Sequence, residues 1–583
     1  MALSTPKLEL SGNHLTNNFG HGEGFDLDRD IVRLTFAQLK REVQKYAAAL
    51  RAAGVGKGDR VAGYMPNCVE TCVAMLATAT VGAVWSSTSV DFGHMGVLDR
   101  FGQIAPKVLF SVEAVVYKGK PFDHMAKLEK VVRELPSLKA VVLCPFVSAE
   151  ADVDLSSLGP NAIYLSQFLK NGQNAAGDFD PLAFEQVPFD HPLFIMFSSG
   201  TTGAPKAMVH SVGGTLLKHL EEHVIQEDMT EKDTIFFWTT CGWMMWNWLM
   251  TSLATGASVV LYDGSPFEPR PSVLFDVAEK TGTSIIGMGA KCYDVYEQKQ
   301  MNFKESHNLN ALRMVLSTGS PLKPACFDYV YKNVKDDLLI GSICGGTDII
   351  ACFMGVGIKH PVYRGEIQCL YLGMNMAAWN EKQEAVLCER GELICLTPFP
   401  SQPTHFLDDP DGSRYRKAYF DKYPGVWAHG DFCILNDKTG GVIMLGRSDG
   451  TLNPGGVRFG SAELYHVVEA FEEIEDSVVV GQKLPDDDER VVMFVKMNNG
   501  FELDATLLKK LKTTIRTSMS PKHVPSVFLV VPDIPYTTSG KKVEIAVKQI
   551  LAGDEVKNAN ALRNPEVLDL FRQLRSHSDL QFA

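Results

Sequence analysis

The stretch Phe197-Ser198-Ser199-Gly200-Thr201-Thr202-Gly203-Ala204-Pro205-Lys206 directly follows an apolar run, Leu193 to Phe197, that predicts a buried β-strand. Glycines, hydroxyl side chains and one lysine after a strand form a flexible nest of N–H and O–H donors that can wrap an anionic phosphate. The loop is not a Walker A motif, because Lys206 precedes Ala207 and no hydroxyl for magnesium follows the lysine. We therefore predict a phosphate-binding turn here, with a plain glycine-serine surface loop as the alternative.

Short apolar strands alternate with helix-length segments on both sides of this loop. A helix is expected from Thr35, where Thr35 and Gln38 form a capping box, and a second capped helix from Asn67 with Glu70 three residues on. Such alternation implies mainly parallel sheets covered by helices, which is an α/β fold. The expected strands are Arg60 to Met65, Ala83 to Ser86, Val108 to Ser111, Ala140 to Cys144, Ser258 to Tyr262 and Met314 to Ser317.

The pattern changes after Arg447. Two strands, Ser477 to Val480 and Val491 to Lys496, flank an acidic turn, and a helix is expected over Ala505 to Thr517. This arrangement predicts a small α+β domain. We therefore divide the chain into a large domain, 1–447, and a small carboxy-terminal domain, 448–583.

Charge and composition exclude several classes of function. The 583 residues carry 56 basic and 69 acidic side chains, a net charge of -13 that repels nucleic acid. A secretory signal and CxxC pairs are absent from the sequence, which favours the cytosol. The uncharged run Ile235 to Tyr262 contains too many polar residues and glycines for a membrane span. His219 and His223 have a zinc-like spacing but no evident third ligand, so we expect no metal there.

Four further motifs stand downstream of the loop. They are Gly345-Gly346-Thr347-Asp348, Trp427-Ala428-His429-Gly430-Asp431, Gly446-Arg447-Ser448-Asp449-Gly450 and Thr538-Ser539-Gly540-Lys541. With the loop, and in this order, they resemble the adenylate-forming superfamily of acyl-CoA synthetases, peptide-synthetase adenylation domains and luciferases. The resemblance implies that the chain activates a carboxylic acid with ATP and Mg²⁺, releases pyrophosphate, and passes the acyl group to coenzyme A.

The resemblance also implies where the nucleotide binds. Asp431 is expected at the ribose, where a carboxylate can accept hydrogen bonds from both hydroxyls. Thr347 and Asp348 are expected near the α-phosphate and its magnesium ion, which phosphates and water largely hold. Aspartate is one methylene shorter than the glutamate that is commoner there, which leaves direct metal contact open. The other nucleotide-binding candidates are Ser198, Thr201, Thr202, Gly203 and Lys206 in the loop, Gly319, Ser320 and Pro321 in an adenine turn, Arg447 at the ribose, and Gly456 and Arg458.

Two residues of the carboxy-terminal motifs carry the expected mechanism. By resemblance, Lys541 bridges the substrate carboxylate and the α-phosphate, where a preformed cation stabilises the developing charge. Asp449 matches a hinge about which the small domain rotates between an adenylation and a thioester-forming orientation. The resemblance thus predicts catalysis in two steps, with Lys541 in place only for the first.

The acyl pocket is expected between the Gly-Gly-Thr-Asp motif and an aromatic segment, with Trp243, Met244, Gly345 and Gly346 as its candidate residues. Family members that activate acetate carry tryptophans just before the threonine, whereas this chain has Cys344 and Gly345, which suggests room for a longer acid. The runs 343–349, 446–460 and 539–544 resemble the members that activate acetoacetate.

Two alternatives to this function stay open, a synthetase for another short-chain acid and a non-catalytic nucleotide-binding protein. The members that activate acetoacetate usually begin with a further segment of several tens of residues, so we expect a shortened amino terminus. Lys118 and Lys120 are further candidates, for the 3′-phosphate of coenzyme A.

Overall fold

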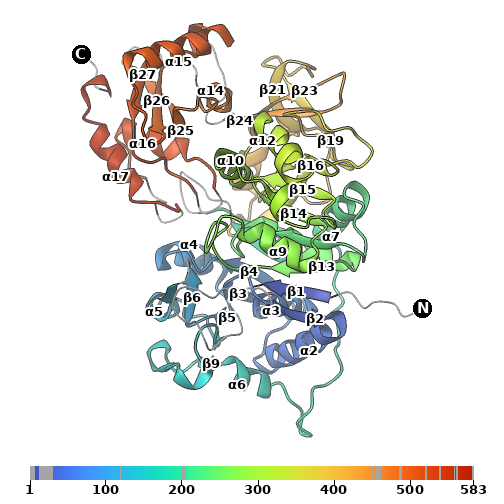
Figure 1. The fold of residues 1–583 in the computed structure, drawn as a ribbon. Coiled ribbons are helices and arrows are strands. Elements are labelled where there is room, and N and C mark those ends of the chain that lie inside the picture. Colours follow the sequence, from blue (N-terminus) through green and yellow to red (C-terminus); the bar gives the residue numbers. More distant parts are fainter. Residues whose placement is uncertain are drawn as a thin grey trace.

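The computed structural model describes residues 31–117, 120–197, 205–448, 461–484, 489–518, 521–537, 540–556 and 562–580, the strand at 7–11, and single positions 452, 454 and 559. Figure 1 shows one large sheet with its helices in the lower part of the molecule, a second that extends from there toward the middle right, a group of antiparallel strands at the upper right, and the carboxy-terminal residues as a separate unit at the upper left. We take these units in turn.

The first large sheet has seven strands and is parallel except at one edge. Its order is β16 (Leu339–Ser342), β15 (Met314–Thr318), β14 (Ile285–Gly289), β12 (Thr234–Phe237), β13 (Ser258–Leu261), β1 (Lys7–Ser11) and β2 (Ile31–Thr35). Its helices include α9 (Val273–Thr281), α10 (Ala290–Gln298) and α12 (Pro324–Tyr329). Because the strands run parallel, their carboxyl ends meet at one edge, where the loops after β12, β14 and β15 lie.

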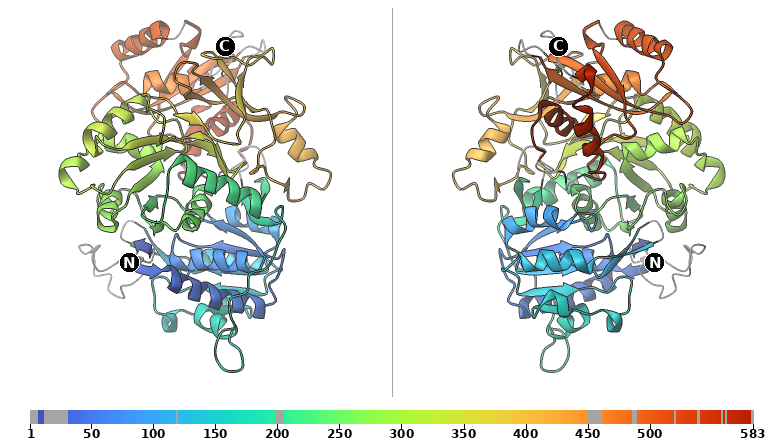
Figure 2. Two further views of the ribbon diagram at one scale, coloured as in Figure 1. Left: turned by 90° about the vertical axis from the view of Figure 1, so that its right-hand side faces the viewer. Right: turned by 90° about the vertical axis from the view of Figure 1, so that its left-hand side faces the viewer.

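The second large sheet has eight strands, of which β11 and β22 run antiparallel to their neighbours. Its order is β22 (His405–Phe406), β11 (Ala207–Ser211), β10 (Pro192–Phe197), β4 (Val84–Thr88), β3 (Arg60–Tyr64), β5 (Val108–Ser111), β8 (Ala140–Leu143) and β9 (Ala162–Tyr164). Helices α2 (Phe36–Ala52), α3 (Val69–Thr80), α4 (His94–Ile104) and α5 (Met125–Arg133) pack around it (Figure 2). The expected α/β fold with mainly parallel large sheets is confirmed.

Two of the smaller antiparallel sheets carry motif residues. One contains β17 (Cys344–Gly346), β18 (Ala351–Gly355) and β19 (Cys369–Leu370). The other contains β20 (Met376–Trp379), β21 (Arg390–Cys395), β23 (Trp427–Leu435) and β24 (Val442–Arg447). Their motif residues, Gly345 and Gly346 on one sheet and Asp431 and Arg447 on the other, lie at the centre of the candidate site described below.

The carboxy-terminal unit is α+β, as expected. Strands β25 (Ile474–Lys483), β26 (Glu489–Met497) and β27 (Val527–Val530) form its sheet, with β25 antiparallel and β27 parallel to β26. Helices α14 (Ser461–Val468), α15 (Ala505–Ser518), α16 (Glu544–Ala552) and α17 (Val567–Leu574) complete it. Apolar side chains of these elements form cores of their own, so the unit has an independent interior.

The capping predictions have two different outcomes. Thr35 caps α2 through the expected box with Gln38. The second prediction is wrong, because Cys68 and not Asn67 occupies the N-cap of α3. The amide of Asn67 is used elsewhere: it donates to the carbonyls of Thr239 and Tyr262 and accepts from the Trp246 indole.

The uncharged run from Ile235 to Tyr262 folds as a strand, a helix and a second strand. It contains most of β12, then α8 (Met244–Thr251), and then β13. In the described ranges there is no helix with the length and apolar character needed to cross a bilayer. The run is interrupted at 238–243, between β12 and α8, and at 252–257, between α8 and β13, so each element is too short to span a bilayer.

Candidate active site

The turn expected to cover adenine lies where β15 ends. Gly319 has a φ of 88°, a conformation that glycine adopts without strain. The hydroxyl of Thr318 donates to the carbonyl of Ile343 over 2.9 Å. This bond ties the turn Gly319-Ser320-Pro321 to the start of β17, so two predicted site segments are adjacent.

Glycines 345 and 346 have different surroundings. A Cβ atom on Gly345 would lie 1.9 Å from the carbonyl oxygen of Ala351, so β18 already occupies that direction. The expected extra space at Gly345 is therefore not found on that side; close strand pairing requires this glycine. A Cβ on Gly346 would lie 3.5 Å from His429 Nε2 and 3.9 Å from Asp348 Oδ2, both ordinary contacts. Gly346 thus borders the polar centre of the site.

Five polar side chains form that centre. Tyr419 donates a 2.6 Å hydrogen bond to Asp348 Oδ1. Asp431 and Arg447 are opposite each other on β23 and β24, with Arg447 Nη1 3.5 Å from Asp431 Oδ2. His429 Nε2 lies 3.7 Å from the same carboxylate oxygen. The structure therefore brings together the Thr-Asp, Gly-Asp and Gly-Arg motifs, which are far apart in the sequence.

The carboxyl group of Asp348 is ionised near neutral pH. Burial raises its pKa, but the electrostatic interaction with the His429 ring, the hydrogen bond from Tyr419, and the cations of Lys206 and Arg447 outweigh burial, and the net pKa lies below the ordinary value. Burial lowers the pKa of His429, so its imidazole is neutral at pH 7. The centre therefore holds an anionic carboxylate and a neutral imidazole side by side.

Lys541 reaches this centre from the carboxy-terminal unit. Its ammonium charge contributes to the lowered pKa of His429. Burial raises the pKa of Cys344 to about 12, and the charge of Lys541 opposes part of that rise. The loop of Lys541 is a tight turn: Thr537 N–H donates to the Lys541 carbonyl over 2.8 Å, and Gly540 has a φ of 78°. The charge of Lys541 thus acts on His429 of β23 and on Cys344 of β17.

Two buried histidines hold the backbone on either side of Asp348. His210 on β11 contacts the Thr347 carbonyl oxygen through Nε2 at 3.0 Å, and His219 on α7 (Val212–Leu220) contacts the Ile350 carbonyl oxygen through Nε2. Burial lowers the pKa of His210 to about 3 and that of His219 to about 4, so both rings are neutral. A carbonyl only accepts, so each Nε2 carries the proton and donates it.

Ile350 shows why this support matters. Its φ is 49°, a left-handed conformation that is strained for a β-branched residue. The hydrogen bond from His219 holds its carbonyl in that conformation two residues after Asp348. His223, one helical turn on, instead contacts the Trp248 carbonyl and Glu227, so the two histidines predicted not to bind metal stabilise neighbouring segments.

The remaining predicted residues have three outcomes. Lys206 lies 5.9 Å from the ring of Tyr419, beside the polar centre. Met244 is buried at the start of α8, and Trp243 packs on Phe237 with ring centroids 6.2 Å apart. Lys120 is exposed on β7 (Lys120–Asp123). Eight further predicted residues lie outside the described residues: Ser198, Thr201, Thr202, Gly203, Asp449, Gly456, Arg458 and Lys118.

Sequence reasoning assigned no role to Tyr419, His210, His219 or His429. His429 stands inside a motif that was recognised, so its position was a usable signal. Tyr419 reaches Asp348 across 71 residues and His210 reaches Thr347 across 137 residues. No local pattern signals such contacts.

Two family profiles match the chain. The AMP-binding enzyme profile matches residues 23–396, and the AMP-binding enzyme C-terminal domain matches residues 466–541. An acetoacetyl-CoA synthetase from Xenopus tropicalis is 57% identical over 546 residues, which cover 94% of this chain and 81% of that protein. The chain belongs to the AMP-binding enzymes, in the acetoacetyl-CoA synthetase family.

Other comparisons agree with this assignment. The acetoacetyl-coenzyme A synthetase of Rhizobium meliloti (strain 1021) is 48% identical over 550 residues, covering 94% of this chain and 82% of that protein. The solved acetoacetyl-CoA synthetase from Streptomyces lividans has a TM-score of 0.88 at 39% identity, covering 98% of this chain and 84% of that one. An anthranilate CoA ligase, AuaEII, solved with anthranoyl-AMP, has a TM-score of 0.74 at 16% identity, covers 92% of each chain, and shares the fold. The family predicted from the motifs is confirmed.

Proposed function

We propose that the chain activates acetoacetate with ATP to form acetoacetyl-adenylate and pyrophosphate, and then transfers the acyl group to coenzyme A with release of AMP. The observation that carries this proposal is 57% identity to an acetoacetyl-CoA synthetase over 94% of the chain. The geometry supports it, because residues of three separate motifs, Asp348, Asp431 and Arg447, lie around His429 in one polar centre.

The residues divide the work of the first step. The carboxylate of Asp431 is placed to accept hydrogen bonds from ribose hydroxyls, with Arg447 beside it. Lys541 supplies positive charge where the carboxylate of the acid meets the α-phosphate. His210 contacts the Thr347 carbonyl oxygen and so holds the backbone next to Asp348. Holding both reactants in place removes much of the entropic cost of the encounter.

We propose that a magnesium ion accompanies ATP. Asp348 fits a role near it, because its carboxylate is ionised and Tyr419 occupies only Oδ1. Magnesium favours oxygen ligands and keeps several waters, so one carboxylate suffices beside the phosphates. When bound, the ion would neutralise phosphate charge. An Asp348→Asn variant should need more magnesium for half-maximal exchange, with the KM for acetoacetate unchanged.

We propose further that the boundary between the two units lies at 447/448 and that Asp449 is the hinge. The end of β24 at Arg447 supports this boundary, because β24 belongs to the sheet of β20, β21 and β23 and α14 belongs to the carboxy-terminal unit. Rotation here would withdraw Lys541 after adenylation and admit coenzyme A. An Asp449→Pro variant should retain exchange and lose thioester formation.

The proposed function is tested by pyrophosphate exchange with a panel of acids. Acetoacetate should support exchange with a higher kcat/KM than acetate, propionate or butyrate, and coenzyme A should then yield AMP and a thioester. Preference for another acid would keep the reaction and replace the substrate. Formation of ADP, or exchange with none of the acids, would contradict the proposal.

A further inference from the structure

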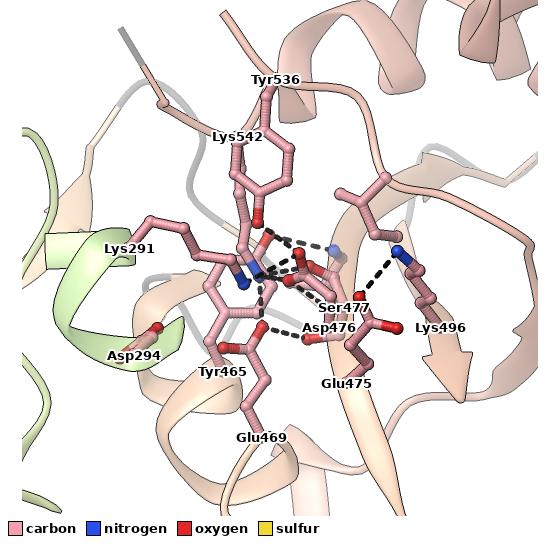
Figure 3. Close-up of polar contacts among 12 residues, drawn as sticks. Lys291, Asp294, Tyr465, Glu469, Glu475, Asp476, Ser477, Lys496, Tyr536 and Lys542 are labelled. Atoms are coloured by element: carbon pink, nitrogen blue, oxygen red, sulfur yellow. Dashed lines mark hydrogen bonds and ion pairs between the residues drawn. The ribbon is translucent and has the colours of Figure 1, made fainter. Parts of the chain in front are cut away.

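A cluster of charged side chains joins the two units beside the candidate site. Lys542, the neighbour of Lys541, is held between two carboxylates of the carboxy-terminal unit: it contacts Glu469 and lies 2.7 Å from Asp476 Oδ1. Figure 3 shows Lys542 between these acids, with Lys291 approaching the same group from helix α10. Only 4% of the Glu469 side chain and 6% of the Asp476 side chain are exposed.

Two lysines of the AMP-binding region complete the cluster. Lys291 Nζ lies 3.3 Å from Asp476 Oδ2, and Lys323 Nζ lies 3.0 Å from Glu469 Oε2. Lys323 also lies 3.0 Å from Asp294 Oδ2. Each buried carboxylate therefore shares its charge between Lys542 on its own unit and one lysine on the other unit.

The cluster is balanced only when the units are joined. Three lysines (Lys291, Lys323 and Lys542) face three acids (Asp294, Glu469 and Asp476) in the joined state. Separation would leave Lys542 as the one lysine of the three beside Glu469 and Asp476, which keep hydrogen bonds from Tyr536 and Ser477 of their own unit. Two buried carboxylates with one cation are less well compensated, so the charges favour the joined orientation.

The position of the cluster connects it to the chemistry. Lys323 follows the turn Gly319-Ser320-Pro321 by two residues and stands at the N-cap of α12. Lys542 directly follows Lys541, and both belong to the loop that Thr537 closes. The ion pairs therefore tie the loop of the adenylating lysine to the segment beside the expected adenine turn.

We propose that Lys291 and Lys323 are positioning residues for adenylation: by pairing with Asp476 and Glu469 they hold the small unit so that Lys541 faces the reaction centre. The inference rests on the proposed function for its kinetic consequence. It predicts that loss of these bridges slows the first half-reaction and spares the second, in which Lys541 takes no part.

The test compares wild-type chain with the Lys291→Met/Lys323→Met variant, which keeps the aliphatic stems and removes both charges. Pyrophosphate-exchange kcat should fall about fivefold or more, with the KM for ATP within about twofold. Thioester formation from supplied acetoacetyl-adenylate should be unchanged or faster. The single variant Lys323→Arg keeps the charge and leaves Lys291 unchanged. It should therefore exchange pyrophosphate as fast as the wild type.

A matched control is Lys299→Met, which removes an exposed lysine at the other end of α10 and should leave both half-reactions unchanged. Unchanged exchange in the double variant, or equal loss in both halves, would overturn the proposal.

Small-angle scattering gives a readout independent of activity: the double variant should have a larger radius of gyration with ATP bound, and an identical profile would also overturn the proposal. If the wild type exchanges with none of the acids, the proposed function fails and the scattering comparison alone decides this inference.

Discussion

At the scale of single residues, the site contrasts the exposed cations Lys541 and Arg447 with several enclosed neutral or anionic groups. Lys541 is exposed, whereas His429 is buried and Asp348 and Asp431 are largely enclosed around it. An exposed lysine on a turn can leave without disturbing a core. The groups that stay, by contrast, are fixed by hydrogen bonds and packing, so under the proposed function we expect the first step to depend on whether Lys541 is present.

Replacement of Lys541 should therefore separate the half-reactions. Lys541→Ala should lower pyrophosphate exchange by about 10²–10³-fold, the usual effect of losing a preorganised electrostatic group. Thioester formation from supplied acyl-adenylate should stay within about threefold of wild type. The control is Lys548→Ala, which removes a surface lysine paired with Glu489. Equal loss in both half-reactions would refute the role assigned to Lys541.

His219 offers a second residue-scale prediction. His219→Leu removes the donor to Ile350 and leaves a buried carbonyl unpaired, a cost of about 1–3 kcal/mol. The strained backbone after Asp348 should relax, and exchange kcat should fall about tenfold. His223→Leu removes a ring of similar burial that does not contact this loop, so it should lower the melting temperature without a comparable loss of kcat. Similar kcat losses in both variants would contradict positioning by His219.

At the scale of elements, local signals predicted the strands and helices well. The strand expected over Val108 to Ser111 is observed with those bounds, and the helix expected over Ala505 to Thr517 ends one residue later. Apolar periodicity and turn residues determine such elements locally. The family motifs likewise located the polar centre, because each motif carries its own chemical signature.

The errors arise where a tertiary contact overrides a local preference. Asn67 is a good N-cap residue, yet its amide bonds Thr239, Tyr262 and Trp246 across at least 172 residues. Gly345 suggested an enlarged pocket, yet its missing side chain accommodates the β18 backbone. Sequence reasoning identifies the residue type in both cases and does not show which neighbour requires it.

The β17–β18 hairpin provides a prediction at this scale. Gly345→Ala would place a methyl group 1.9 Å from the Ala351 oxygen, so the strands must separate. We expect a loss of about 1–3 kcal/mol in stability and of most exchange activity, since Asp348 follows on the same hairpin. Gly346→Ala meets its nearest atom at 3.5 Å and should fold with wild-type stability. Thermal unfolding and exchange assays on both variants test this, and equal stability of the two would contradict it.

At the scale of the whole molecule, charged side chains cross between the two units, and none of the apolar clusters found among the described residues spans both. The apolar clusters of the carboxy-terminal unit contain only residues of that unit, while Lys291 and Lys323 cross to it as ion pairs. Ion pairs at a partly exposed interface are exchangeable with water, unlike interdigitated side chains. Such an interface is consistent with the proposed rotation of the carboxy-terminal unit between two orientations.

The same charges predict how stability depends on pH. Burial raises the pKa of both Glu469 and Asp476, but the neighbouring lysines outweigh burial. Lys542 and Lys323 lower the pKa of Glu469 below its ordinary 4.5. Lys542 and Lys291 lower the pKa of Asp476 below its ordinary 3.8. The unfolded chain therefore binds more protons in acid than the folded chain. The ionised Glu469 and Asp476 stabilise the folded chain fully above about pH 5. This stabilisation is lost as the pH falls through 4 toward the folded pKa values, and it amounts to about 1.4 kcal/mol for each pH unit by which folding lowers a pKa.

Calorimetry from pH 8 to pH 3 tests this expectation. The melting temperature of the carboxy-terminal transition should be flat above about pH 5 and should fall steeply below it. In Asp476→Asn the transition should begin lower at pH 7, because Lys542 and Lys291 lose a charged partner, and should depend less on pH below 5. Asp336→Asn, which removes an exposed partner of Lys304, should reproduce the wild-type curve. An acid-induced decline equally steep in Asp476→Asn would show that other carboxylates govern the acid stability of this unit.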